Sequence, residues 1–85
     1  MGKYLTEADL AEIIRPASEA IPEGSYWTHV VGGGQYIVDC IAIAEGSQEP
    51  VVVYHAIGQR KTAWVRVARD FLDGRFVRSV PAEDL

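Results

Sequence analysis

The side chains best suited to chemistry in this sequence are tryptophan, histidine and arginine residues that recur at alternate positions. Trp27 is followed two residues later by His29, and Trp64 is followed in the same way by Arg66. Because successive side chains of a β-strand point to opposite faces, each pair shares one face of its strand. Where two such faces meet, an indole ring stacks on a flat ligand while a guanidinium binds a carboxylate or phosphate through its planar fork.

Aromatic and basic side chains on these and the neighbouring strands form the predicted ligand-binding surface. Its members are Trp27, His29, Tyr36, Tyr54, Trp64 and Arg66. A structural role is the alternative, because large aromatic side chains in a small domain mostly serve the core. In that case both tryptophans are packing residues and Arg66 forms an ion pair with Asp39 or Asp70.

Acid–base catalysis is a weaker alternative. His29 and His55 are the only histidines, and either one beside Asp39 would make the acid–base pair of a small hydrolase. The spacing of His29, His55 and Asp39 does not require these residues to be in contact. No set of nucleophile, base and orienting residue can be recognised in the sequence. Cys40, the single cysteine, fits a buried structural thiol better than a nucleophile. We therefore expect a non-catalytic binding module for a small anionic or aromatic ligand or a peptide, with no cofactor and no metal.

Size and composition predict one cytoplasmic globular domain. The chain has 85 residues, of which 48% are hydrophobic and 24% are charged, and these values are typical of a domain with a single core. The lone cysteine excludes an internal disulfide, and the first residues lack the apolar core of a signal peptide. No apolar run approaches the length that spans a bilayer, so we expect no membrane partner.

The charge distribution leaves nucleic-acid or nucleotide binding as a second candidate function. The net charge is −4, yet residues 51–85 hold six basic and four acidic side chains, and the basic ones gather between Arg60 and Arg78. A basic stretch with aromatic neighbours attracts phosphates and stacks bases in other small barrels. This stretch is much weaker than the basic surface of a dedicated nucleic-acid binder, which favours a solvated surface instead.

An amphipathic helix is predicted at the start of the chain. Thr6 and Asp9 have the spacing of an N-cap and its acidic partner. The apolar positions that follow keep the helical period through Pro16, where we expect the helix to end or kink, with a further turn before Pro22. The apolar stripe either covers the β core or forms a homodimer interface. The residues of that interface would be Leu10, Ile13, Ile14 and Ile21.

After the helix the pattern changes to short strands rich in β-branched and aromatic residues. The predicted strands cover 26–31, 36–44, 51–57, 62–67 and 75–80, with a helical turn over 68–73. Such short connections favour antiparallel neighbours. The predicted fold is mainly β: a small SH3-like five-stranded antiparallel barrel or roll at 24–80, preceded by the helix at 1–23, in a single domain spanning 1–85.

Several of these positions together resemble a known family. The resemblance rests on Gly24 just before the first strand with Trp27 and His29 within it, on Val51 to Tyr54 in the third strand and Trp64 to Arg66 in the fourth, and on Asp73 to Phe76 at the start of the last. The chain is similar over about residues 22–77 to the small bacterial family called domain of unknown function 1653. The resemblance implies an SH3-like β-roll and no established activity, and it leaves the N-terminal helix outside the shared region.

Two positions depart from the family pattern. Val67 stands where the family usually has proline, which sets the turn into 68–72 less rigidly. His55 stands where many members have arginine, and its charge depends on pH. An anion site shared by the family is therefore expected to be weaker in this chain.

Overall fold

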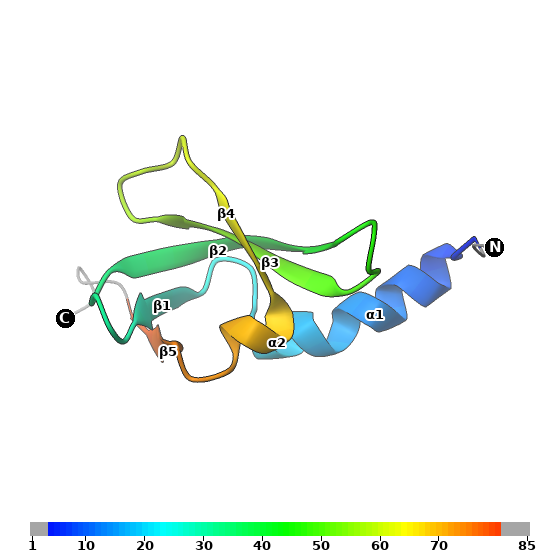
Figure 1. Ribbon diagram of the computed structural model, residues 1–85, viewed down its shortest axis with the longest axis horizontal. Helices are drawn as coiled ribbons and strands as arrows, with labels where there is room; N and C mark the ends of the chain where they lie inside the picture. Colours follow the sequence, from blue (N-terminus) through cyan, green and yellow to red (C-terminus); the bar gives the residue numbers. More distant parts are fainter. Residues whose placement is uncertain (1–3, 81–85) are drawn as a thin grey trace.

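The computed structural model describes residues 4–80, so residues 1–3 and 81–85 of the predicted domain lie outside the described part. Two helices and five strands follow one another along the chain (Figure 1). They are α1 (Glu7–Ala20), β1 (Tyr26–His29), β2 (Gln35–Ile43), β3 (Pro50–Ala56), β4 (Trp64–Val67), α2 (Ala68–Phe71) and β5 (Phe76–Ser79). No helix of this part is long and apolar enough to cross a membrane.

The five strands form one antiparallel sheet in the order β4-β3-β2-β1-β5, curled into a half-barrel. This confirms the predicted fold class of a mainly β roll behind an N-terminal helix. β4 and β5 are the two edges of the sheet and do not pair with each other, so the roll stays open instead of closing into a barrel. α2 connects these two edges and lies on the concave side (Figure 1).

The predicted strands agree with the observed ones to within two residues at each end. The two largest differences have local causes. Val30 and Val31 were predicted as strand but belong to a turn, in which the Gly33 N–H donates to the His29 carbonyl at 2.8 Å. Thr62 was predicted to begin the fourth strand, but it lies in the β3–β4 connection, where its N–H donates to the Gln59 carbonyl at 3.4 Å.

Helix α1 begins with the predicted capping box. The Thr6 hydroxyl accepts from the Asp9 N–H at 3.1 Å, and the Asp9 carboxylate accepts from the Thr6 N–H at 3.0 Å. We expected the helix to end or kink at Pro16, with a further turn before Pro22; it does not end there but continues to Ala20. Proline removes the donor that would bond the carbonyl of Glu12. Both residues lie on the exposed side of the helix, so that carbonyl does not have to be buried without a partner.

The core lies in the concavity of the sheet, beneath the C-terminal end of α1 and α2. Ile21, Val38, Val52 and Phe71 are the largest fully buried side chains. Phe71 stacks on Phe76 with ring centroids 4.3 Å apart. The N-terminal half of α1 extends past the sheet (Figure 1), and its apolar residues are only partly buried.

A β-bulge interrupts the pairing of β2 with β3. Val38 pairs with Tyr54 and Cys40 pairs with Val53, so Asp39 is the extra residue. A bulge bends its strand and redirects a side chain. Here Asp39 is directed at His55 on the convex face of the sheet, and the two residues form a contact described below.

Candidate functional site

A cavity of about 200 Å³ lies inside the curl of the sheet, lined by aromatic and basic side chains. All five strands contribute to it. The lining residues are His29 from β1, Tyr36 from β2, Tyr54 from β3, Trp64 and Arg66 from β4, and Phe76 from β5. We call it the aromatic cavity.

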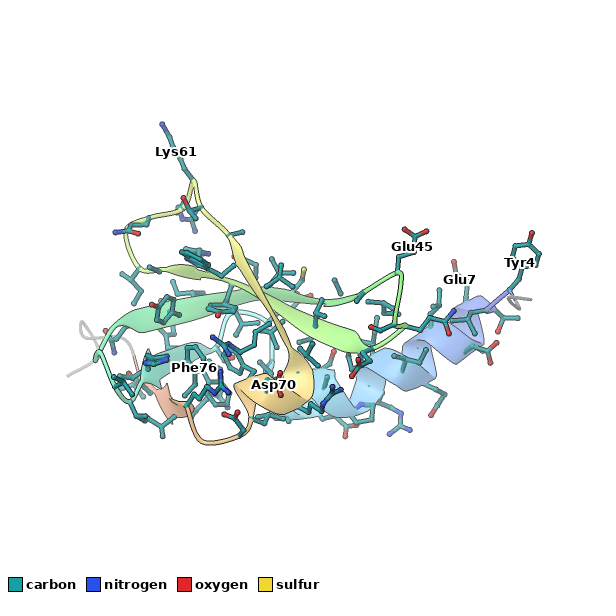
Figure 2. All side chains as sticks on the ribbon, viewed as in Figure 1. Tyr4, Glu7, Glu45, Lys61, Asp70 and Phe76 are labelled. Atoms are coloured by element: carbon teal, nitrogen blue, oxygen red, sulfur yellow. The ribbon has the colours of Figure 1, made fainter. Side chains whose placement is uncertain are left out.

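The register of the sheet explains why these residues meet. His29 pairs with Phe76 across β1 and β5, and Tyr54 pairs with Trp64 across β3 and β4. Paired residues point to the same face of a sheet. The curl then brings edge β4 towards edge β5, so that Arg66 reaches the ring of Phe76 although three strands separate them in the sheet. Figure 2 shows Phe76 on the concave side, where α2 lies.

The walls of the aromatic cavity are held by edge-to-face ring contacts. The Tyr36 and Tyr54 centroids are 5.5 Å apart at 80°. Each of these tyrosine rings also meets Phe76, at 5.7 Å and 5.6 Å respectively. Such pairs add to the burial free energy and restrain the rings. The cavity is therefore a preformed feature of the fold.

Arg66 supplies the positive charge of the cavity. Its guanidinium carbon lies 5.7 Å from the Phe76 ring centroid. Its Nε atom is buried and has no hydrogen-bond partner within residues 4–80. The alternative in which Arg66 pairs with Asp39 or Asp70 is wrong, because neither carboxylate forms an ion pair with it and Asp39 pairs with His55. Since the lining residues include no carboxylate, no acidic side chain of residues 4–80 compensates this cation inside the cavity.

His29 adds a second polar group to the same cavity. Its ring meets Phe76 edge-on at 4.9 Å. Its Nδ1 accepts a hydrogen bond from the Val31 N–H at 3.3 Å. A neutral imidazole that accepts at Nδ1 carries its proton on Nε2. His29 therefore offers an N–H donor from Nε2, in keeping with an anionic ligand.

The two tryptophans have different environments. Trp64 is 53% exposed at the rim of the cavity, so its indole face is available for stacking. Trp27 is 7% exposed and does not line the cavity, in the position that the structural alternative expected. Its indole Nε1–H donates to the Ser25 hydroxyl at 2.8 Å, and its ring meets Phe71 edge-on at 5.1 Å. Trp27 is thus a core residue, and its hydrogen bond satisfies the one polar atom that its burial would otherwise leave unpaired.

Five of the six predicted site residues line the aromatic cavity, and the prediction missed Phe76. Phe76 opens β5 and pairs with His29. A signal was present in the sequence, because Phe76 and Arg78 alternate in the same way as Trp27 and His29.

A second, larger hollow lies on the opposite face of the sheet, under the β3–β4 connection. It measures about 720 Å³, and we call it the convex groove. Its lining is Ile37 and His55 from the sheet together with Ile57, Gly58, Gln59, Arg60, Lys61 and Thr62. His55 is 5% exposed, and its Nδ1 lies 2.9 Å from an oxygen of Asp39.

The histidines predicted as members of one acid–base set lie in different places. His55 and Asp39 form the pair that this alternative requires, but His29 lines the aromatic cavity on the other face. Tyr54 and His55 are neighbours in β3 and so point to opposite faces, which separates the two sites. In the described part of the chain no three side chains of the metal-binding types gather closely enough to hold an ion.

The basic stretch between Arg60 and Arg78 does not form one continuous cationic face. Arg69 pairs with Glu49, and Arg75 pairs with Asp73 at 3.0 Å. Arg78 lies over the Trp27 ring at 5.8 Å, and Arg66 lies in the aromatic cavity. The basic side chains of this stretch are therefore distributed over different surroundings and do not form one cationic surface.

Comparison with known proteins finds no family model, no curated protein and no solved structure that matches this chain. The likeness to the family called domain of unknown function 1653 therefore stays a prediction. Function has to be argued from the geometry of the two hollows.

Proposed function

We propose that the protein is a non-catalytic binding module whose aromatic cavity takes a single aromatic ring carrying one anionic group. The observation that carries this proposal is the buried, unpartnered Nε of Arg66 beside the exposed indole of Trp64. A buried polar atom without a partner costs free energy unless something pairs with it, and a carboxylate or phosphate pairs with a guanidinium best.

Size and shape support a ligand of this class. An apolar cavity of about 150 Å³ is known to hold benzene. The aromatic cavity, at about 200 Å³, has room for one six-membered ring and a small substituent. The ring would stack on Trp64, and its anionic group would accept hydrogen bonds from Arg66 and His29. A free aromatic acid, an aromatic residue at the carboxyl end of a peptide, and a phenyl phosphate all share this chemistry.

Titration with benzoate and phenyl phosphate, followed by NMR of ¹⁵N-labelled protein, tests the proposal. We expect shifts at Trp64 and Arg66 and a loss of those shifts in Trp64→Ala and Arg66→Ala. Arg15→Ala is the matched control, because Arg15 is exposed on α1 and its ion pairs among the described residues are with Glu12 and Glu19. Cyclohexanecarboxylate, which keeps the charge and the ring size without the π face, should bind more weakly. Equal shifts in the wild type and in both cavity variants would show that the ligand site lies elsewhere.

Nucleotide binding is distinguished in the same titration. A nucleic-acid or nucleotide ligand held by several of the arginines would lose affinity steeply as salt rises, because each phosphate contact releases counterions. A ligand held by one buried guanidinium depends on salt much less. A steep salt dependence with an oligonucleotide would favour nucleic-acid binding over our proposal. We also propose that the protein is cytoplasmic and that it belongs to the family called domain of unknown function 1653.

A further inference from the structure

The convex groove contains a second buried nitrogen without a partner. His55 Nε2 is shielded from solvent and forms no hydrogen bond within residues 4–80, although its residue lines the groove. The other ring nitrogen, Nδ1, is engaged by Asp39 at 2.9 Å. His55 is thus oriented through Nδ1, while Nε2 has no partner; because Nε2 is shielded from solvent, a ligand reaches it only by displacing the atoms that cover it.

The bulge in β2 creates this arrangement. In the register of β2 and β3, Ile37 pairs with His55, and the next residue on the same face is Asp39. Because Asp39 is the inserted residue, its side chain is redirected to the edge of the imidazole ring. The Asp39 side chain is 40% exposed and that of His55 is 6% exposed, so the carboxylate stays hydrated while the imidazole is enclosed.

The tautomer of His55 selects the chemical group that fits Nε2. With Asp39 accepting from Nδ1–H, a neutral ring presents a lone pair at Nε2, whereas a cationic ring presents an N–H. A carboxyl group matches both forms. As a carboxylate it accepts from the cationic ring, and as a carboxylic acid it donates to the neutral ring, with one proton shared between the same two atoms.

The rest of the groove defines the remainder of the ligand. Ile37 and Ile57 give it apolar walls, and no carboxylate is among the lining residues. Arg60 and Lys61 belong to the rim, and neither forms an ion pair within the described residues. The rim is therefore electropositive and attracts anions. Figure 2 shows the Lys61 side chain at the tip of the connection, pointing away from the sheet, where its charge adds to the positive potential of the rim.

We propose that the convex groove is a second binding site, which takes a monocarboxylate with an apolar body and holds its carboxyl group on His55 Nε2. At about 720 Å³ the groove has room for a ligand larger than the aromatic cavity admits. The site is independent of the proposed function, because Tyr54 and His55 point to opposite faces of β3. The two hollows share no lining residue, and either site stands if the other fails.

Titration with octanoate, monitored through the ring resonances of His55 in ¹H–¹³C NMR spectra, tests this site. We expect saturable shifts at His55 and Ile57. 1-Octanol, which keeps the chain and lacks the carboxyl group, should bind at least tenfold more weakly. His55→Gln should lower the octanoate affinity at least tenfold, and Asp39→Asn should lower it severalfold by releasing the ring.

Two matched variants separate binding on His55 from a general effect of charge and from binding in the aromatic cavity. Arg15→Ala removes an exposed charge on α1 that lines neither hollow, so it should change octanoate affinity less than twofold. Arg66→Met alters only the aromatic cavity and should leave the octanoate shifts at His55 unchanged. If His55→Gln does not fold, Asp39→Asn and the octanol comparison still decide the matter. Absence of His55 shifts with octanoate, or equal affinities for octanoate and octanol, would overturn the proposal.

Discussion

Replacing Arg66 by methionine should raise the stability of the protein while abolishing ligand binding at the aromatic cavity. Arg66 Nε is buried without a partner, and a buried unsatisfied polar group costs about 1–3 kcal/mol. Methionine keeps a similar unbranched stem and removes that group. The substitution also removes the contact of the guanidinium with Phe76, which is worth about 0.5–1 kcal/mol. The free energy of unfolding should therefore rise by up to about 2.5 kcal/mol, with about 1 kcal/mol at the centre of the range.

The same substitution should weaken binding of phenyl phosphate. Hydrogen bonds to charged groups contribute about 1.5–3 kcal/mol, and each 1.4 kcal/mol corresponds to about a tenfold change in affinity. Loss of the guanidinium is thus expected to cost roughly ten- to 150-fold in Kd. A substitution that raises stability but weakens binding is typical of a functional residue, here one whose polar group has no partner until a ligand binds.

Thermal unfolding followed by circular dichroism, with and without the ligand, measures both effects. For a domain of this size, each kcal/mol shifts Tm by about 4–8 °C, so the free variant should melt a few degrees above the wild type. Arg15→Met is the control for loss of one charge, since Arg15 is exposed, and it should change Tm little. A fall in the Tm of Arg66→Met would show that Arg66 serves the fold and that the expected gain in stability is wrong.

Further predictions concern the helix and the turns. Ile21→Ala removes a fully buried side chain and should lower the free energy of unfolding by about 2–5 kcal/mol, whereas Ile14→Ala, at a partly buried position, should cost clearly less in the same urea titration. Thr6→Ala deletes the cap of α1 and should cost about 1 kcal/mol, with reduced helix content by circular dichroism. Gly33 has a φ of +75°, so Gly33→Ala should cost about 1 kcal/mol and leave the oligomeric state unchanged. If the extended half of α1 forms a homodimer, Ile13→Asp should convert it to a monomer in sedimentation velocity, and a wild type that is monomeric at all concentrations would contradict that interface.

The sequence predicted the members of the aromatic cavity because period-2 alternation assigns residues to faces. Trp64 and Arg66 were correctly placed together for this reason. The same rule could not distinguish Trp27 from His29, which share a face of β1. Their difference arises from depth, since Phe71 of α2 covers Trp27 and leaves His29 beside the cavity. Which residue a helix covers depends on tertiary packing, which alternation does not encode.

The sequence alone did not predict whether Asp39 and His55 would be in contact. Their contact lies at a bulge, which strand alternation does not predict. If Asp39 were paired regularly, without a bulge, strict alternation would continue through β2 and place Cys40 on the concave face. The bulge keeps Cys40 on the convex face, opposite Val53, and directs Asp39 to the ring. Pro16 is the converse case: a local rule predicted an end or a kink there, and the helix continues because Ala17 and Ile21, beyond the proline, pack in the core.

The proposed function depends on Arg66, which is expected to bind the anionic group of a ligand in the aromatic cavity. The decisive measurement follows the Nε–Hε resonance of Arg66 in ¹H–¹⁵N spectra during titration with phenyl phosphate. We predict a large, saturable downfield proton shift of this resonance, with smaller shifts at the Trp64 indole and none at the guanidinium of Arg15. A saturating ligand that leaves the Arg66 Nε–Hε resonance in place would contradict the proposed role of Arg66.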